Sequence, residues 1–429
     1  MSLLDWADGL PGRWEAKPLR STADYVVSNV DKVPAENEVP VRLCNYTDVY
    51  NNEFITLDLD FMQSTASEDE IAKFGLLVDD VVITKDSESW DDIGVPALVR
   101  ETASDLVCGY HLALLRPRKR NMDGAFLFRC LQAKPIRVQL ELAANGVTRF
   151  GIPKSEIGAM TLPVPPLPQQ RAIADYLDRE TARLDGLVAA KERVLGLLAE
   201  KRRALITRAV TRGLDPHAPL RDSGIPWLGE IPAHWQTRRV AWLFRERDER
   251  EEPDLPLLEV SINSGVVRRE LLEDRIESTA ADFNTYKVAR AGDVVFNKMR
   301  MWQGAVGVAP EAGLVSPDYT VAAPSGPLSS EYAEYLFRTE MFSAECARRS
   351  HGIVWDRLRL YWEGFRDIEV PLPSPDEQSA IIALVAAETF KLDALRSATE
   401  RTIALLKERR AALIAATVTG AIDVREATT

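Results

Sequence analysis

The strongest constraint on the fold of this chain is an internal duplication. Residues 162–215 and 370–423 align without a gap at a constant offset of 208 positions, and 23 of the 54 aligned pairs are identical. The stretches before and between these two copies repeat much less well. The two similar copies, which we call the frame, predict one constant role that is performed twice. The two diverged segments, which we call the inserts, are where selectivity is expected.

Length and composition describe a globular protein of several domains. At 429 residues the chain is too long for one ordinary core, and roughly three units are expected. No stretch approaches the ~18 consecutive apolar residues of a membrane span, and the first residues lack the basic and apolar regions of a secretion signal. Four widely separated cysteines indicate reduced thiols. We therefore expect a cytoplasmic protein without membrane association.

The charge distribution restricts how the chain can meet nucleic acid. Its net charge of −12 argues against a general nucleic-acid binder, because neutralised phosphates are the main source of non-specific affinity. The inserts 1–161 and 216–369 have net charges of −8 and −6, whereas the first copy of the repeat has +3 and residues 370–429 have −1. Any contact with DNA must therefore be local, or supported by a basic partner.

Each copy of the repeat begins with a proline-rich run, at 162–170 and at 370–378. Such runs are not helical and favour an extended strand or spacer. About forty residues without proline follow each run, which predicts a long helix. In the second copy, Ser374 is a suitable cap, Pro375 fits the first helical position, and Glu377 completes a capping box.

The two predicted helices have apolar residues at seven-residue spacing and should end at Gly213 and Gly420. This heptad pattern predicts that they pair as a coiled coil, and the intervening insert allows the pairing to be antiparallel within one chain. About 42 residues at 1.5 Å each give a helix of roughly 60 Å. Packing of each helix on its own domain is the alternative. The residues assigned to the coiled-coil seam and to partner docking are Ile173, Leu177, Leu184, Leu187, Leu198, Leu205, Ile381, Val385, Leu392, Leu395, Leu406 and Leu413.

The two inserts share a fainter likeness to one another. DVVITK at 80–85 resembles DVVFNK at 293–298, and apolar runs in both segments and at 112–115 predict short strands. A helix is expected within 331–349. The predicted fold class is therefore α+β, in which two strand-rich mixed α/β domains are separated by two long helices that pair as an antiparallel coiled coil, with a pseudo-two-fold internal repeat. The predicted segments are 1–161, 162–215, 216–369 and 370–429.

These features together resemble the specificity subunits of type I restriction–modification systems. The likeness lies in the two proline-rich approaches to a glutamine, at 163–170 and 371–378, and in WLGEIPAHW at 227–235. It also lies in GDVVFNKMRMWQGAVG at 292–307 and SPDY at 316–319. The resemblance covers essentially the whole chain in the expected order, although the first insert keeps only traces of the FNKMRMWQGA segment.

The resemblance implies an adaptor without catalysis of its own. Each insert would be a target recognition domain that reads one half of a bipartite site in double-stranded DNA. The paired helices would set the spacing and dock two methyltransferase subunits. S-adenosylmethionine, ATP and Mg would belong to these and to the restriction/translocase subunits, so this chain would hold no cofactor.

The residues agree with an adaptor. The chain lacks the Asn/Asp-Pro-Pro-aromatic tetrapeptide of an amino-methyltransferase and the G-x-x-x-x-G-K-[ST] phosphate loop. Asp80 with Lys85, and Asp293 with Lys298, loosely resemble a nuclease pair, but the acid–x–Lys element is missing and a strand start is favoured. Four scattered histidines suggest neither a catalytic triad nor a metal site. We expect no catalytic residue and no metal ligand.

DNA recognition requires base-reading donors together with phosphate anchors. In the second insert, the run 297–303 combines amides suited to adenine, a guanidinium suited to guanine, and an aromatic ring. In the first insert, 116–120 is the densest basic cluster. Any one of these side chains could be an ordinary solvated group. The candidate DNA-binding residues are Lys85, Arg116, Arg118, Lys119, Arg120, Arg149, Lys154, Asn297, Lys298, Arg300, Trp302, Gln303, Arg348, Arg349, Arg357 and Arg359.

Two other readings remain open from the sequence. One is a coiled-coil scaffold of a multi-subunit complex that does not read DNA, and the other is an enzyme with an unrecognised site. Substitution of Lys298 and Arg300 separates the adaptor from the scaffold, because only the adaptor would change its target. The four tryptophans that recur in the inserts, Trp6, Trp14, Trp227 and Trp235, are interpreted as packing residues at the core or the domain seam.

Overall fold

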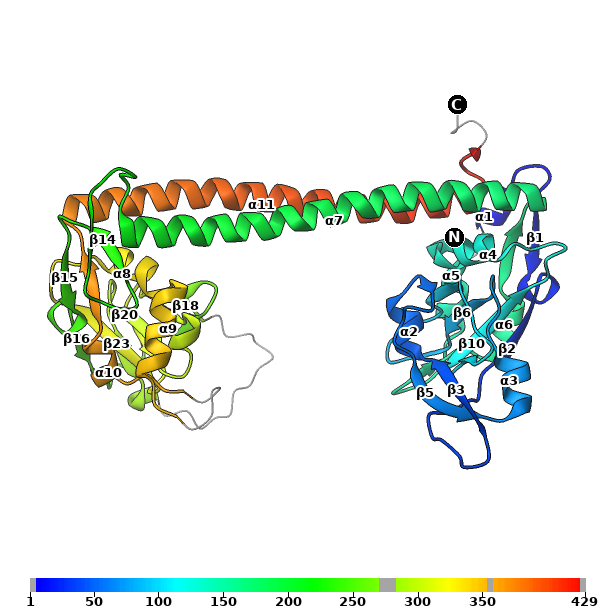
Figure 1. Ribbon diagram of the computed structural model, residues 1–429, viewed down its shortest axis with the longest axis horizontal. Coiled ribbons are helices and arrows are strands. Elements are labelled where there is room, and N and C mark those ends of the chain that lie inside the picture. Colours follow the sequence, from blue (N-terminus) through cyan, green and yellow to red (C-terminus); the bar gives the residue numbers. More distant parts are fainter. Residues whose placement is uncertain (1–4, 270–282, 353–357, 425–429) are drawn as a thin grey trace. The chain divides into compact units, whose positions relative to one another are not determined.

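The computed structural model describes residues 5–269, 283–352 and 358–424. The chain divides into two compact units, Met1–Glu192 with Arg401–Thr429 (unit 1) and Arg193–Glu400 (unit 2). Each unit contains one insert and parts of both long helices, α7 (Leu167–Arg212) and α11 (Pro375–Val418) (Figure 1). The predicted α+β class with two long helices is confirmed.

The insert of unit 1 is built on a five-stranded sheet in the order β2-β10-β6-β8-β4 and a three-stranded sheet in the order β5-β3-β9. The strands predicted at 81–83 and 112–115 are central in the larger sheet. Helices α4 (Gly124–Gln132) and α5 (Lys134–Ala143) cover it. The strand bounds are Ala23–Val27 (β2), Leu112–Pro117 (β10), Val81–Thr84 (β6), Pro96–Val99 (β8), Phe54–Ile55 (β4), Met62–Ala66 (β5), Val39–Cys44 (β3) and Leu106–Cys108 (β9).

The insert of unit 2 has a four-stranded sheet in the order β16-β23-β20-β21 and two strand pairs, β17-β18 and β19-β22. Their bounds are Phe244–Arg247 (β16), Tyr319–Pro324 (β23), Val294–Asn297 (β20), Val306–Val308 (β21), Leu258–Ser261 (β17), Gly265–Arg268 (β18), Lys287–Ala289 (β19) and Gly313–Val315 (β22). The helix expected within 331–349 is two helices, α8 (Ser330–Phe337) and α9 (Glu340–Arg349). The break occurs because the Thr339 side chain accepts from the Phe342 N–H and caps α9.

Each proline-rich run forms a strand and then the first turn of a long helix. In unit 1, β12 (Thr161–Val164) pairs antiparallel with β1 (Glu15–Pro18), and in unit 2, β24 (Glu369–Leu372) pairs in the same way with β15 (Gln236–Arg239). The expectation of an extended run is therefore wrong at the end of the first run, where α7 begins at Leu167, whereas α11 begins at Pro375 as predicted. Pro168 and Pro375 lie in the first helical turn, where a missing N–H costs no hydrogen bond.

A buried glutamine joins each long helix to its insert. Gln170 and Gln378 are 0% and 1% exposed and occupy equivalent positions in the repeat. Each amide oxygen accepts from one backbone N–H of the insert, and each amide nitrogen donates to two carbonyls, all at 2.8–3.0 Å. The partners are Asp123, Asn121 and Pro165 for Gln170, and Ser329, Pro327 and Pro373 for Gln378. The same amide therefore fixes the same junction twice.

A tryptophan reinforces each junction. The indole N–H of Trp14 donates to Gln169 at 3.2 Å, and that of Trp235 donates to Glu377 at 2.8 Å. These contacts confirm both tryptophans as seam residues. Ser374 caps α11 as predicted, since its hydroxyl accepts from the Glu377 N–H at 3.3 Å. The capping-box role of Glu377 is wrong, because its carboxylate accepts from the tryptophan instead.

We predict that Gln378→Ala or Gln170→Ala lowers the melting temperature, measured by differential scanning calorimetry. Each substitution leaves three backbone groups without a partner, one of them in a buried hydrogen bond and two in part-buried ones. A buried unsatisfied group costs about 1–3 kcal/mol. Gln63→Ala is the matched control, because Gln63 is exposed. An unchanged melting temperature for Gln378→Ala would show that the amide does not hold the junction.

The two long helices pair antiparallel in both units. In unit 1, Asp185 and Glu192 of α7 contact Arg410 and Lys407 of α11 at 2.9 and 3.9 Å, so residue numbers rise along one helix as they fall along the other. In unit 2, Arg202 contacts Asp393 at 2.7 Å. The Arg202–Asp393 and Asp185–Arg410 pairs are equivalent under the 208-residue offset. One ion pair, used twice, therefore fixes the register of the helices.

In α11 the buried residues include a row that repeats every eleven residues. Eleven residues in three turns give 3.67 residues per turn, close to the 3.6 of a straight helix, whereas a seven-residue row drifts by about 20° per heptad. Of the predicted seam, Leu187 and Leu395 are 43% and 56% exposed, so the heptad assignment is wrong there. The other predicted positions are buried, or half-buried in the case of Leu198, Leu205, Leu406 and Leu413. The eleven-residue row of α11, Ile381, Leu392, Ile403 and Ile414, is buried, whereas its equivalent in α7 is buried at Ile173 and Leu184 and half-buried at Leu195 and Ile206.

Two leucines of α11 test this seam. We predict that Leu392→Ala lowers the free energy of unfolding by about 2–4 kcal/mol, because it leaves a cavity between the helices. Leu395→Ala removes the same atoms from an exposed position and should cost less than about 1 kcal/mol. Thermal unfolding of both variants measures the difference. Equal losses of unfolding free energy would show that Leu395 belongs to the seam, as the heptad pattern predicts.

Candidate nucleic-acid interface

The candidate run of the second insert is a compact loop after β20. The side chain of Asn297 accepts from the Met299 N–H at 2.9 Å, and the indole N–H of Trp302 donates to the Met299 carbonyl at 2.9 Å. These contacts shape the loop and occupy part of both side chains. Arg300 and Gln303 are exposed. The loop therefore presents one guanidinium and one amide to solvent.

A second basic group lies beside this loop. Trp302 and Gln303 line a hollow of about 580 Å³ together with Arg348 of α9. The buried carboxylate of Glu345 contacts the guanidinium groups of Arg348 and Arg349 at 2.7 and 2.6 Å. Arg348 nevertheless stays mostly exposed, so an ion pair orients it without covering it. Two clusters that are far apart in the sequence thus meet on one surface.

Lys298 and Arg359 both contact the turn at 316–319. The Lys298 ammonium donates to the Pro317 carbonyl at 3.4 Å, and burial lowers the pKa of this lysine. Arg359 lies 3.9 Å from the Asp318 carboxylate. Arg357, also a candidate, lies outside the described residues. Lys298 is therefore less accessible to DNA than Arg300.

The first insert builds a corresponding surface. Strand β7 (Asp86–Ser87) pairs with β11 (Phe150–Gly151), which places the segment after Lys85 next to Arg149. The Lys85 ammonium forms a half-buried ion pair with Asp86 at 2.5 Å, whereas Arg149 is exposed. Lys154 is also exposed and lies over the ring of Tyr25. Arg149 and Lys154 are the accessible cations of this surface.

The cluster at 116–120 does not act as one group. Arg116 donates to the buried carboxylate of Asp80 at 2.7 Å, and this hydrogen bond raises its pKa. Arg118 is paired with Asp24 at 2.7 Å. Lys119 and Arg120 are exposed. The prediction is corrected for Arg116, because an arginine committed to a buried carboxylate supports the fold and is not free to read bases.

An equivalent ion pair occurs in unit 2, where Arg247 of β16 contacts the buried carboxylate of Asp293 at 2.7 Å. Asp80 and Asp293 immediately precede the equivalent strands β6 and β20. The arginine that neutralises Asp80 comes from the adjacent strand β10, whereas the one that neutralises Asp293 comes from β16, which β23 separates from β20. The resemblance of these aspartates to a nuclease pair has this structural explanation. The sequence did not reveal it, because the arginine comes from a different strand in each insert.

We predict that Arg116→Ala destabilises unit 1 by about 2 kcal/mol or more, because it leaves the Asp80 carboxylate buried without its partner. Arg120→Ala removes the same charge from an exposed site and should change the stability by less than about 0.5 kcal/mol. Urea unfolding followed by tryptophan fluorescence measures both. Equal stability of the two variants would contradict the structural role of Arg116.

The described residues contain no group of three or more His, Cys, Asp and Glu side chains that could hold a metal ion. No helix within the described ranges is both long enough and apolar enough to cross a bilayer.

Comparison with known proteins gives a consistent result. No family model matches the sequence. The chain is 22% identical over 228 residues to the MjaX type I restriction enzyme specificity subunit of Methanocaldococcus jannaschii, covering 53% of this chain and 52% of that protein. It is 26% identical over 212 residues to the EcoKI specificity subunit of Escherichia coli, covering 48% and 44%. The chain thus spans about half the length of the curated relatives it matches.

Solved structures extend the likeness to nearly the whole chain. The HsdS subunit from Thermoanaerobacter tengcongensis is similar over 96% of this chain and 98% of that one, with a TM-score of 0.55 and 17% identity. A chain from a type I R-M system, studied for complex assembly and conformational transition, covers 96% and 99% with a TM-score of 0.71. The chain has the fold of a type I specificity subunit. The resemblance predicted from the sequence is confirmed.

The carboxylates that position the candidate cations of this specificity-subunit fold were not predicted from the sequence. Glu345 orients Arg348 and Arg349, and Asp86 holds Lys85. The spacing of three and four residues from Glu345 to the two arginines, on one helix, is a signal that could have identified the first group. Asp86 follows Lys85 directly and carries no comparable spacing signal.

Proposed function

We propose that the chain is the DNA sequence-specificity subunit of a type I restriction–modification complex, in which each insert reads one half of a bipartite site in double-stranded DNA. The observation that carries this proposal is that the candidate surface is built twice in the same way. The carbonyl of Lys85 accepts from the Ile152 N–H at 2.9 Å, and the carbonyl of Lys298 accepts from the Leu360 N–H at 2.9 Å. Ile152 and Leu360 are equivalent under the 208-residue offset.

The two surfaces differ in the side chains that they expose. Arg300, Gln303 and Arg348 are exposed in unit 2, whereas Arg149 and Lys154 are exposed in unit 1. Arginine suits guanine and glutamine suits adenine in the major groove, and lysine and arginine also bind phosphate. A common frame with different exposed donors supports two half-sites of different sequence.

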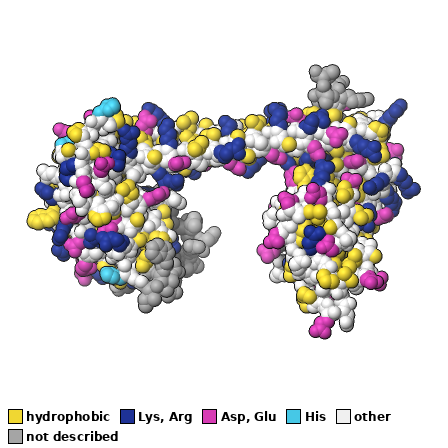
Figure 2. Space-filling model, in the orientation of Figure 1, with side chains coloured by type: hydrophobic (Ala, Val, Ile, Leu, Met, Phe, Trp, Pro, Cys, Tyr) yellow, Lys and Arg dark blue, Asp and Glu magenta, His cyan; other side chains and the backbone are white. Residues whose placement is uncertain are grey.

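The paired helices offer docking surfaces for partner subunits. Leu187 and Leu405 are exposed in unit 1, and their equivalents Leu395 and Leu197 are exposed in unit 2. Figure 2 shows hydrophobic side chains among charged ones on the surface of these helices. Exposed apolar residues at repeated positions favour burial against a partner. Because the positions are equivalent, we propose two copies of one partner, the methyltransferase subunit.

In this proposal the chain has no catalytic role. The methyltransferase subunits would supply S-adenosylmethionine and methylate adenine, and the restriction/translocase subunits would use ATP and Mg. A chain with a net charge of −12 gains little from counterion release. The isolated chain should therefore bind duplex DNA weakly, and its affinity should rise when the methyltransferase subunits join the complex.

We predict that deletion of this chain from its host removes adenine methylation at one bipartite motif, consisting of two short half-sites around a fixed gap. Sequencing that detects methylated adenine across the genome measures the loss. Re-expression of the Arg300→Ala variant should relax one half of the motif, because a bidentate base contact contributes about 1–3 kcal/mol of discrimination. Arg149→Ala should affect the other half only.

Each variant is the control for the other. Melting temperatures close to that of the wild type would show that both variants fold, since both side chains are exposed. An unchanged methylation map after deletion, with the cognate methyltransferase expressed and active, would contradict DNA specificity and favour a coiled-coil scaffold.

A further inference from the structure

The two copies of the repeat differ in charge near the ends of the long helices. Residues 201–212 contain five basic side chains, whereas the equivalent residues 409–420 contain two. The three additional arginines of the first copy are Arg203, Arg208 and Arg212, and the second copy has Ala411, Ala416 and Gly420 in their places. The frame is therefore duplicated in shape but not in charge.

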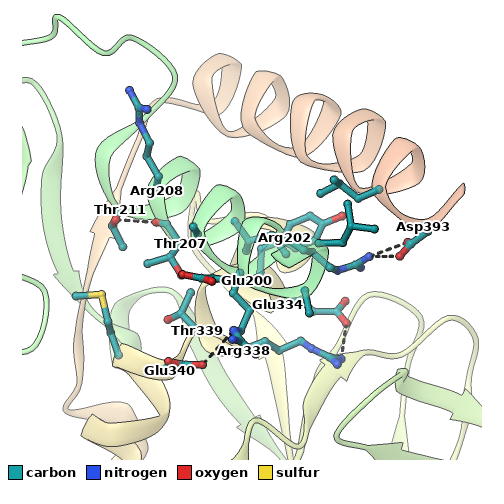
Figure 3. Close-up of a pocket in the computed structure, with 18 of the residues that line it drawn as sticks. Glu200, Arg202, Thr207, Arg208, Thr211, Glu334, Arg338, Thr339, Glu340 and Asp393 are labelled. Atoms are coloured by element: carbon teal, nitrogen blue, oxygen red, sulfur yellow. Dashed lines mark hydrogen bonds and ion pairs between the residues drawn. The ribbon is translucent and has the colours of Figure 1, made fainter. Parts of the chain in front are cut away.

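All three additional arginines line one groove of unit 2. The groove has a volume of about 1470 Å³ and lies along α7, beside the turn between β17 and β18 and the α8–α9 segment (Figure 3). Six arginines and four carboxylates line it, which gives a local excess of positive charge in an acidic chain. Such a groove favours an anionic ligand.

The arginine that both copies share, Arg202 in unit 2, forms a close ion pair, whereas the three additional arginines do not. Arg202, equivalent to Arg410, contacts both carboxylate oxygens of Asp393 at 2.7 Å and joins the helices (Figure 3). Arg208 is exposed and has no ion pair or side-chain hydrogen bond within the described part of the chain. Figure 3 shows it apart from the ion pairs of the groove. Its charge is therefore available to a ligand.

Arg203 and Arg212 have only loose partners. Arg203 lies 3.4 Å from Glu340, with side chains that are 63% and 84% exposed. Arg212 lies 3.5 Å from Glu230, and both side chains are more than half exposed. Exposed pairs of this kind contribute about 0–1 kcal/mol, so an incoming anion can replace the carboxylates at little cost.

The groove adjoins the candidate base-reading surface. Arg338 and Glu340 line both this groove and the smaller hollow formed with Trp302, Gln303 and Arg348. A ligand that contacts the loop after β20 can therefore extend along the groove. Duplex DNA is anionic and is long enough to contact the loop and the groove together. Its bases would face the loop, and its phosphates would face the arginines of α7.

We propose that this groove binds the sugar–phosphate backbone of the DNA beside the half-site read by the insert of unit 2. This inference rests on the proposed DNA-specificity function and adds an asymmetry to it. Ala411, Ala416 and Gly420 in the second copy cannot make the same contacts, so one half-site gains phosphate anchors that the other does not. Phosphate contacts are independent of base sequence. The arginines therefore set affinity and salt dependence, and leave the recognised motif unchanged.

The test compares Arg203→Ala/Arg208→Ala with a charge-matched control, Arg193→Ala/Lys201→Ala. The control removes two exposed cations from the same helix at positions that do not line the groove. Alanine already stands at the equivalents of Arg203 and Arg208, so the helix is expected to tolerate it. The probes are fluorescent duplexes with the mapped motif intact or with both half-sites scrambled. The complex that copurifies with the full tagged chain is titrated by anisotropy at several NaCl concentrations.

We predict that the slope of log Kd against log salt falls by about 2 for Arg203→Ala/Arg208→Ala, since each lost phosphate contact removes about one ion. The fall in slope should be equal on the intact and the scrambled duplex, and the methylated motif should stay the same. The control variant should keep the wild-type slope. A wild-type slope for Arg203→Ala/Arg208→Ala, or an equal fall in the control, overturns the groove proposal.

Failure of the proposed function would give a different result. The wild-type complex would then bind the intact and the scrambled duplex equally, whatever the slopes of the variants. Preference for the intact duplex together with an unchanged slope would leave DNA specificity in place and remove the groove alone.

Discussion

The architecture depends on a buried amide that is used twice. Gln170 and Gln378 each satisfy three backbone groups at the point where a long helix leaves its insert. A buried polar group is costly unless all its partners are present, so the amide permits one arrangement of helix and insert and excludes others. The inserts could diverge in sequence because the groups that bind the amide are backbone atoms, which substitution does not remove.

The acidic character of the chain is compatible with nucleic-acid recognition because its charges are distributed unequally. Buried carboxylates such as Asp80, Asp293 and Glu345 are matched by arginines within their own insert. Accessible cations such as Arg300 and Arg149 lie on the two surfaces that we propose for DNA contact. An acidic chain disfavours arbitrary DNA, so in the proposed function selectivity depends on contacts to base edges and on partner subunits.

The sequence predicted the repeat, the strand-rich inserts and the long helices because these follow from local patterns and from internal identity. It failed where two distant segments decide the outcome. Leu187 and Leu395 fit a heptad by spacing, yet both are exposed, and α11 instead buries a row at eleven-residue spacing, which only the pairing reveals. Arg116 looked like part of a basic cluster, yet its partner Asp80 lies on a neighbouring strand. Composition cannot distinguish a cation that is paired with a buried carboxylate from one that is exposed and unpaired.

Duplication explains why the asymmetry near the ends of the helices is informative. In two copies of one ancestral segment, residues needed for pairing or junctions should stay alike, as Arg202 and Arg410 do. Arg203 and Arg208 differ from Ala411 and Ala416, so pairing does not require them. An exposed arginine adds positive charge that a pairing helix does not need, and these two line the same groove beside the loop after β20. Comparison of the two copies thus separates the residues that build the paired helices from those that we propose to serve one half-site.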